Sequence, residues 1–303
     1  MNKKRNDSYI EIIKPENDSL VFKHLKKLLD HKKRKKIKYR KLSSSLKILY
    51  LDIETSPILS LTWGTYNQYI SPAQIIHPSS IMCFSALWDH ETKKDIMFDS
   101  IHESKFSDMM KRLHSLLSEA DLVVHYNGKK FDIARINREF IKLNLGPPDR
   151  YAQIDLLQIV KAVGGFDSNK LEYVSQTLGI GSKIENAGFP LWIGCMSGDE
   201  TSWKIMKLYN EEDSWLLKGL YHMYLPWIRV HPNVAIYEAA EGETISLPTC
   251  TNCGSTDVIK KGVAKTKTQM YQRYKCKCCG THLRGRKTIL PKESRKNILT
   301  QEV

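Results

Sequence analysis

The sequence predicts an α/β protein, with a mixed sheet flanked by helices and a small metal-binding module near the C-terminal end. Between residues 46 and 235, apolar runs of strand length first follow one another and then alternate with amphipathic helical patterns, an order typical of α/β sheets. Five of the seven cysteines fall between Cys250 and Cys279, which favours a metal site over a disulfide framework. With 303 residues and 41% apolar side chains, the chain can bury one substantial core and a small satellite module.

The spacing of apolar residues sets the expected elements. Alternating or continuous apolar runs bounded by polar residues predict strands, and apolar residues three and four apart predict helices. The expected strands are 46–53, 81–88, 95–99, 122–124 and 153–155, and the expected helices are 105–120, one that follows Asn127, 170–178 and 202–224.

Charge is concentrated at the two ends of the chain. Residues 1–49 carry 16 basic and 5 acidic side chains, residues 250–303 carry 13 and 3, and residues 50–249 carry 18 and 25. An acidic middle between basic flanks fits a carboxylate-rich catalytic body whose appendages bind a polyanion, although lysine runs also occur as solvated tails. We divide the chain into a basic N-terminal arm, an α/β domain, a linker, a cysteine module and a tail, at 1–45, 46–235, 236–249, 250–290 and 291–303.

The sequence contains no run of about 18 apolar residues, and its first residues are polar and rich in lysine. We therefore expect neither a membrane-spanning helix nor a secretory signal, and a cytoplasmic location follows as the expectation.

Two acids interrupt the apolar strand expected at residues 46–53 and just beyond it. Asp52 and Glu54 are two residues apart, so strand geometry places both on the same face. A buried carboxylate costs several kcal/mol unless it is paired or bound to a metal, so this pair indicates ligands for a divalent cation. The alternative is that both acids lie where the strand emerges into water.

Two further sites carry acids in positions that suit the same chemistry. Asp132 begins the helix after Asn127, where a first-turn acid is also favoured by the helix dipole. In the long helix expected at 202–224, Tyr209 and Asp213 are four residues apart and therefore lie on one face, which continues into apolar residues. A phenol and a carboxylate on an inward-facing surface favour a functional site over simple core packing.

In order and spacing, these motifs resemble those of the DEDD group of proofreading-type 3′–5′ exonucleases, which have the ribonuclease-H-like (DnaQ-like) fold. Residues 52–54 resemble the first motif, residues 127–132 the second and residues 209–213 the third. The tyrosine in the third motif is typical of the DEDDy subclass, as in the exonuclease domains of family B polymerases. Residues 168–174, 209–210 and 225–233 further resemble stand-alone, phage-type exonucleases with a C-terminal zinc ribbon, for which the host-cell cytoplasm is the expected location.

The resemblance implies a 3′–5′ exonuclease that hydrolyses phosphodiester bonds of DNA with two Mg²⁺ or Mn²⁺ ions. It implies that Asp52 bridges both ions, that Glu54 and Asp213 complete the site of the ion that activates water, and that Asp132 holds the second ion, partly through water. Tyr209 is implied to orient the attacking water. The residues leave an exo- or endoribonuclease, a structure-specific nuclease and a non-catalytic nucleic-acid-binding adaptor open as alternatives.

The C-terminal cysteines form two Cys-x-x-Cys-Gly turns separated by 22 residues. Four thiolates with this spacing predict a structural Zn²⁺ held by Cys250, Cys253, Cys276 and Cys279. Cys278 is a spare cysteine in the second turn, and a nearby histidine, His282, could substitute for one ligand. The basic, aromatic stretch between the turns resembles zinc ribbons that bind nucleic acid.

Several other side chains compete for roles near the expected site. Asp155 ends a predicted strand and could be a fifth carboxylate, whereas helical geometry turns Glu211 and Glu212 away from the face of Tyr209. Aromatic residues also follow the first motif in a loop, where they could stack on a terminal base but more often pack. These residues are Trp63, Tyr66 and Tyr69.

Overall fold

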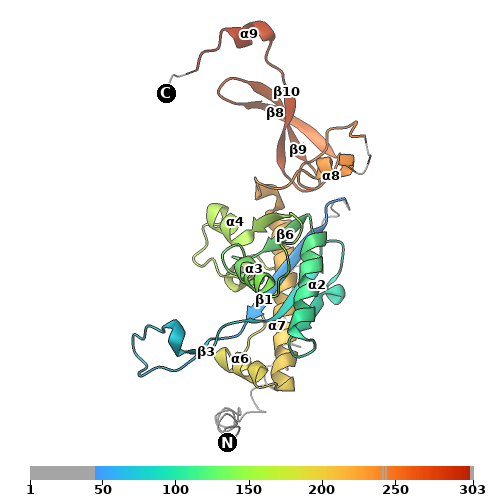
Figure 1. Cartoon of the computed structure of the whole chain (residues 1–303). Coiled ribbons are helices and arrows are strands. Elements are labelled where there is room, and N and C mark those ends of the chain that lie inside the picture. Colours follow the sequence, from blue (N-terminus) through green and yellow to red (C-terminus); the bar gives the residue numbers. More distant parts are fainter. Residues whose placement is uncertain (1–44, 241, 243, 301–303) are drawn as a thin grey trace, which may run out of the picture.

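The computed structural model describes residues 45–240, 242 and 244–300 (Figure 1). The basic arm expected at residues 1–45 lies outside the described residues except for Ser45. The described chain folds into a helix-flanked sheet and a smaller three-stranded module that packs on one end of it.

A five-stranded mixed sheet in the order β5-β4-β1-β6-β7 forms the centre of the α/β domain. Strand β1 (Ile48–Thr55) lies in the middle, antiparallel to β4 (Ile81–Trp88) and parallel to β6 (Leu122–His125). The edge strands are β5 (Met97–Ser100), antiparallel to β4, and β7 (Ala152–Asp155), parallel to β6. Strand β4 is buried along its whole length, which explains its continuous apolar run in place of an alternating one.

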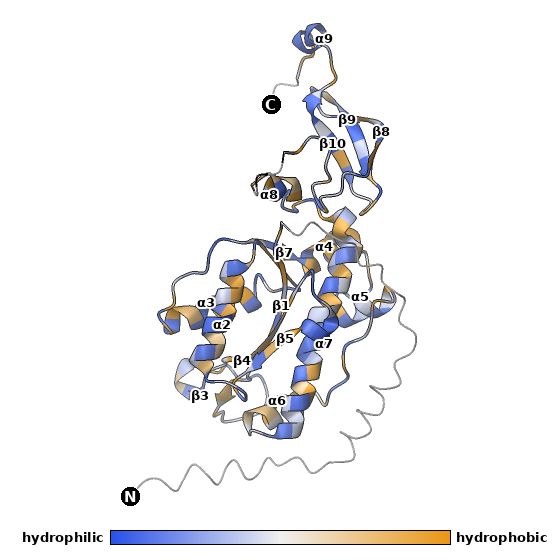
Figure 2. Cartoon of the chain, turned by 90° about the vertical axis from the view of Figure 1, so that its right-hand side faces the viewer, coloured by the Kyte–Doolittle hydropathy of each residue, from blue (hydrophilic) through white to orange (hydrophobic). Residues whose placement is uncertain are grey.

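Helices cover both faces of this sheet, as Figure 2 shows. From β1, Leu49 and Leu51 pack with α2 and α3, and Ile48 and Tyr50 pack with α4, α5 and α7. The alternation follows from strand geometry, which points successive side chains to opposite faces. The helices are α2 (Phe106–Glu119), α3 (Asp132–Lys142), α4 (Leu156–Val163), α5 (Leu171–Thr177), α6 (Phe189–Met196) and α7 (Glu200–Tyr224). The predicted mixed sheet flanked by helices is thus confirmed.

An arm made of residues 56–80 leaves the sheet at the end of β1 and returns at the start of β4 (Figure 1). It contains the short antiparallel strands β2 (Leu59–Ser60) and β3 (Ile75–His77) and the 3₁₀ turn η2 (Pro72–Gln74). The sequence patterns did not predict these short strands, because two or three residues are too few to show a period.

The C-terminal module is a three-stranded antiparallel sheet in the order β10-β9-β8. Its strands are β8 (Val258–Lys265), β9 (Met270–Cys276) and β10 (His282–Thr288). Helix α8 (Val234–Ala240) precedes it and occupies the first part of the expected linker, and the short helix α9 (Lys292–Lys296) follows it in the expected tail. A small zinc ribbon fits this module.

The ribbon is continuous with the core of the α/β domain. Its four turn cysteines belong to the same buried cluster as Leu216 and Leu220 of α7. Asn252, in the first cysteine turn, donates hydrogen bonds from Nδ2 to the carbonyl oxygens of Leu225 (2.9 Å) and Ile228 (3.2 Å). These contacts attach the ribbon to the C-terminal end of α7.

Most predicted elements agree with the structure to within two residues at each end, but the structure contains additional short helices that the sequence did not predict. Helices α4, α6 and α8 were not expected, because each spans only seven or eight residues and offers little periodicity. Among the described residues, no helix has both the length and the apolar character that crossing a bilayer requires.

Candidate active site

Three of the predicted carboxylates come together beside the C-terminal end of β1. One oxygen atom each from Asp52, Glu54 and Asp213 lies within 4.8 Å of the others. Asp52 and Glu54 project from the same face of β1, and α7 packs on this strand and supplies Asp213. Asp213 is almost completely buried, with 1% of its surface exposed. The structure therefore places acids from the first and third sequence motifs in one cluster.

Small polar residues bring α7 close enough to the sheet to form this cluster. Ser85 of β4 is directly opposite Asp52 in the sheet, and its hydroxyl donates to the carbonyl oxygen of Asn210 at 2.7 Å. The hydroxyls of Ser85 and Ser214 are also 2.7 Å apart. Because serine is small and can satisfy a helix carbonyl, the helix axis approaches the strand where Asp213 must reach the acids of β1.

Two neighbouring side chains, one buried and one partly buried, contact the β1 carboxylates. Asn210, with no exposed surface, donates from Nδ2 to Oδ2 of Asp52 at 2.6 Å. Trp192 of α6 hydrogen-bonds the carboxylate of Glu54, which lowers the pKa of that group and opposes the effect of its burial. Neither residue was singled out as a site residue from the sequence. For Asn210, the sequence does offer a signal in its position next to Tyr209, on a helix predicted to carry the site.

Lys183 places a cation against the third motif. Its ammonium group pairs with the carboxylate of Asp213 and donates to the hydroxyl oxygen of Tyr209 at 3.0 Å. The residue lies in the connection between α5 and α6, and about a quarter of its side chain is exposed. The pKa of Lys183 is raised, because the attraction of Asp213, Tyr209 and Asp52 exceeds the opposing effect of burial. Lys183 therefore stays charged and offsets part of the negative charge of the cluster.

Asp132 is buried near the cluster but stands outside the group of three. It is the first residue of α3, and a backbone hydrogen bond from Ile53 of β1 lowers its pKa while burial raises it. Its negative charge in turn raises the pKa values of Asp52 and Glu54. The structure thus places Asp132, the acid of the second motif, beside strand β1 but outside the group formed by the three clustered carboxylates.

The electrostatics of the cluster favour a bound cation. Burial raises the pKa of Glu54 to about 8 and those of Asp132 and Asp213 to about 6, and it raises the pKa of Asp52 well above its ordinary value. Repulsion from Asp213 adds to the effect of burial on Asp52 and Glu54. Such shifts arise when carboxylates share a site that lacks enough positive charge to balance them.

The residues present fit a divalent metal ion. Within the described part of the chain, Oδ1 of Asp213 is buried without any hydrogen-bond partner. An unpartnered buried carboxylate oxygen is costly, and coordination to a cation would satisfy it. Carboxylate oxygens are the ligands that Mg²⁺ and Mn²⁺ prefer. Asp52, Glu54 and Asp213 could hold one such ion, and Asp132 is placed to contribute to a second.

The four predicted zinc ligands form a separate, fully buried cluster. The Sγ atoms of Cys250 and Cys279 are 3.5 Å apart, and those of Cys253 and Cys276 are 3.6 Å apart. These distances are far longer than the ~2.05 Å of a disulfide and close to the ~3.8 Å expected between thiolates bound tetrahedrally at ~2.3 Å from Zn²⁺. Cys278 lies outside this group of four, and so does His282. The geometry is compatible with a structural zinc site.

Asp155 and Glu212, two other acids near the expected site, lie outside the carboxylate cluster and bind other partners. Asp155 caps α4 by accepting from the amide of Leu157 at 3.1 Å, and it also accepts from the amide of Asn127 at 2.8 Å. Glu212 turns away from Tyr209, as expected, but it is buried there and pairs with Lys93. Asp155 therefore supports the turn of the second motif, whose Asn127 has a left-handed backbone with φ of 65°.

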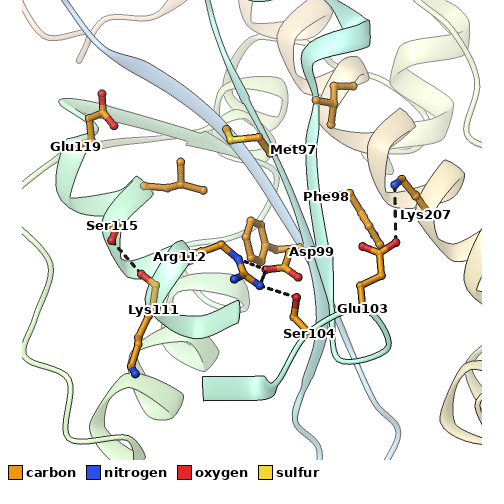
Figure 3. A pocket seen from close by; sticks show the side chains of 13 residues that line it. Met97, Phe98, Asp99, Glu103, Ser104, Lys111, Arg112, Ser115, Glu119 and Lys207 are labelled. Atoms are coloured by element: carbon orange, nitrogen blue, oxygen red, sulfur yellow. Dashed lines mark hydrogen bonds and ion pairs between the residues drawn. The ribbon is translucent and has the colours of Figure 1, made fainter. Parts of the chain in front are cut away.

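A cavity of about 800 Å³ lies at the outer edge strand β5, away from the carboxylate cluster (Figure 3). Its charged lining residues already have ion-pair partners, which for Lys111 and Glu119 are Asp108 and Lys47 outside the lining. Arg112 pairs with Asp99 and also donates to the hydroxyl of Ser104, and Lys207 lies 3.9 Å from Glu103. Because these charges are already satisfied and none of the clustered acids lines the cavity, we assign it no chemistry.

Residues 76–225 match the family model described as RNase_H superfamily, so this stretch has the RNase H-like fold. The match supports a nuclease, a hydrolase whose substrate is a nucleic acid, and nucleases of this superfamily generally use divalent metals. Among solved structures, the chain is similar to the family B DNA polymerase from the hyperthermophilic archaeon Pyrobaculum calidifontis, at 16% identity and a TM-score of 0.43. That similarity covers 60% of this chain and only 25% of the polymerase. No curated protein matches the chain.

We predict that Mg²⁺ stabilises the protein more at pH 8 than at pH 5.5. An acid whose pKa is raised by folding binds more protons in the folded than in the unfolded state, so its contribution to stability falls as pH rises through the folded value. For Glu54, Asp132 and Asp213 this window runs from about pH 4 to pH 8. A bound cation offsets the loss of stability that comes from ionising these buried carboxylates. It also competes with fewer protons for them at high pH. Thermal unfolding with and without Mg²⁺ across this range measures the effect.

The matched controls for this prediction are Asp213→Asn, which should reduce the Mg²⁺ effect, and Asp149→Asn, which should not. Asp149 is exposed in the loop before β7. A Mg²⁺ effect that is equal at both pH values would contradict the assignment of these acids to a cation site.

Proposed function

We propose that the protein is a metal-dependent 3′–5′ exonuclease that hydrolyses phosphodiester bonds of DNA. The observation that carries the proposal is the buried cluster of Asp52, Glu54 and Asp213, with Tyr209 on the same helix face as Asp213 and Asp132 close by. Two bound divalent ions would activate a water molecule and relieve charge on the leaving 3′ oxygen. Asp52, Glu54 and Asp213 would hold the ion near the water, and Asp132 and Asp52 would hold the other.

The side chain of Tyr209 is suited to orient the attacking water. Burial and the charge of Asp213 raise its pKa, so the phenol stays protonated at neutral pH. Its oxygen accepts from Lys183, which leaves its own O–H as a donor to a water beside Asp213. Lys183 thereby fixes the direction of the phenol and the position of the Asp213 carboxylate together.

Replacing Tyr209 by phenylalanine is expected to lower the turnover number about 10²- to 10⁴-fold while metal affinity changes little. The change removes the hydroxyl that Lys183 contacts but leaves the four carboxylates. Tyr173→Phe is the matched control, because Tyr173 belongs to α5 and its hydroxyl donates to Asp167 in the loop before that helix at 3.0 Å. Turnover and Mn²⁺ titration of both variants measure the effect, and unchanged turnover in Tyr209→Phe would remove the residue from its assigned role.

One face of the ribbon is suited to hold the phosphate backbone of the substrate. Arg273 of β9 is directly opposite Arg284 of β10, and Arg284 also lies over the ring of Tyr271 at 4.5 Å. Like charges directly opposite each other destabilise a sheet, so their pairing indicates a polyanionic ligand. Lys275 and His282 continue this exposed face by one more pair.

Replacing both Arg273 and Arg284 by alanine is expected to weaken DNA binding and to reduce the slope of log K against log[salt] by about 2, since each phosphate contact contributes roughly 0.9. Turnover at saturating substrate should not change, because the ribbon does not touch the reacting atoms. Lys47→Ala and Lys111→Ala are controls, since each lysine already pairs with a carboxylate. An unchanged salt slope in the double variant would argue against this face.

The proposal is tested by following 5′-labelled and 3′-labelled DNA and RNA, single-stranded and duplex, with Mg²⁺ or Mn²⁺ and without either ion. The expected result is a ladder that shortens from the 3′ end only in the presence of the ion, with DNA preferred to RNA. Cleavage of RNA instead, or of branched DNA, would support the proposed catalytic site but show that its substrate is not the one proposed. Retention of nucleic acid without any cleavage would favour the non-catalytic adaptor.

A further inference from the structure

The arm of residues 56–80 exposes large aromatic side chains to solvent. Trp63 is fully exposed, and Tyr66 and Tyr69 are 82% and 86% exposed. In Figure 1 the arm projects from the domain as a separate loop beyond the end of β1. Exposed apolar groups of this size, gathered on one segment, are typical of an interaction surface.

The arm is also free of charged side chains. No aspartate, glutamate, lysine or arginine occurs from Thr55 to Trp88, although 26% of the whole chain is charged. The arm therefore offers phosphates no lysine or arginine side chain, and its one ionisable group of basic character is the imidazole of His77. Its available surface consists of aromatic rings, aliphatic groups, hydroxyls and amides, which is the chemistry that complements nucleobases.

Hydrogen bonds within the arm give it a defined shape. The amide of Leu61 donates to the carbonyl of Gln74 at 3.0 Å, and the side-chain amide of Gln74 donates back to the carbonyl of Leu61 at 2.9 Å. The side chain of Gln68 donates to the carbonyl of Tyr66 at 2.8 Å. A surface that is ordered before binding loses less conformational entropy when a ligand arrives.

The root of the arm adjoins the carboxylate cluster. Ser56 is two residues beyond Glu54 in the chain, which is about 7 Å along a strand. There the amide of Ser56 donates to the carbonyl of Ser80 at 2.8 Å, and the amide of Ser80 donates to the hydroxyl of Ser56 at 3.0 Å. A strand whose terminal phosphodiester lies at the cluster therefore has its adjacent nucleotides within reach of the arm.

We propose that the arm binds unpaired bases of the strand being cut by stacking them on Trp63, Tyr66 and Tyr69. This inference rests on the proposed function, because it needs a nucleic-acid strand in the carboxylate cluster. Stacking tolerates every base, since each base presents a π-face. The ribbon and the arm then divide the substrate between them: the ribbon binds phosphates through charge, and the arm binds bases without charge.

The test compares binding of two single strands, one with normal bases at its 3′ end and one with five abasic sites there. An Asp52→Asn background without added divalent cations prevents cleavage. Alanine at Trp63, Tyr66 and Tyr69 together is expected to weaken binding of the normal strand about 10- to 100-fold and to remove the preference over the abasic strand. The salt dependence should not change, in contrast to the Arg273 and Arg284 variant.

Two variants keep the test specific. Phenylalanine at the same three positions retains the rings and is expected to bind as the unmodified arm does. Trp227→Ala removes an exposed aromatic outside the arm, next to the end of α7, and should keep the preference for normal bases. Thermal unfolding of each variant shows whether the fold is intact.

Equal binding of normal and abasic strands by the unmodified arm, or unchanged binding by the triple alanine variant, would overturn the proposal and would leave a protein partner as the occupant of the arm. Failure of the proposed exonuclease is distinct, because it shows as absent cleavage of labelled strands in Mg²⁺ or Mn²⁺ by the unaltered protein. Binding with base preference but without cleavage would support the arm and reject the exonuclease.

Discussion

Replacing Asp52 by asparagine is expected to lower the rate of phosphodiester cleavage about 10³-fold or more. The charges of Asp213, Glu54 and Asp132 all raise the pKa of Asp52, which adds to the effect of its burial, and in the proposed site Asp52 would help to hold both ions. Stabilisation by a bound metal is worth several kcal/mol in the transition state, and each 1.4 kcal/mol changes the rate tenfold. Single-turnover cleavage of 5′-labelled DNA in Mg²⁺ measures the loss.

The same substitution should not destabilise the protein when divalent cations are absent. The asparagine keeps an oxygen that can accept from Asn210, and it removes a charge that Glu54 and Asp213 repel. We therefore expect a melting temperature at or above that of the unmodified protein in a buffer without Mg²⁺. Cleavage at the normal rate would show that the cluster is not the catalytic site, and a large loss of stability would mean that Asp52 is needed for folding.

The architecture was largely predictable because its long elements carry strong periodic signals. Strands β1 and β4 are rich in apolar residues and α7 spans 25 residues, so the sequence pattern alone predicts these elements. The short elements were missed for the opposite reason. Helix α6 has eight residues and begins at Phe189-Pro190, and its role is to bring Trp192 over the first motif, which only the packed structure reveals.

In the candidate site, three acids that the sequence singles out lie together, whereas the residues that contact them carry no such signal. Asp52 and Glu54 interrupt an apolar run, and Asp213 lies on the inward face of a helix, so each conflicts with its surroundings in a way that the sequence shows. Lys183 has no such signal, because it is one lysine in a loop of a strongly basic chain and lies 30 positions before Asp213. Its pairing with Asp213 depends on how the connection between α5 and α6 folds back over α7.

Removing the zinc site is expected to destabilise the whole chain as well as the ribbon. The four cysteines are part of the buried cluster that includes α7, and Asn252 hydrogen-bonds the two carbonyls just after that helix. Structural zinc contributes about 10–16 kcal/mol of binding free energy in small zinc-finger peptides. If a third of this binding free energy, about 3–5 kcal/mol, stabilises the α/β domain, losing the zinc lowers its melting temperature by roughly 6–20 °C for a domain of this size.

Cys276→Ser measures this coupling, and Cys278→Ser is its matched control because Cys278 lies outside the group of four thiols and only two residues away. Zinc content and thermal unfolding should change in the first variant and not in the second. A ribbon that melts separately, with the unfolding of the α/β domain unaltered, would contradict the shared core.

If the coupling holds, a deletion of residues 250–303 cannot isolate the contribution of the ribbon to DNA binding, because it also exposes the apolar end of α7. The Arg273 and Arg284 substitutions, which leave the thiols in place, are then the cleaner measurement of that contribution.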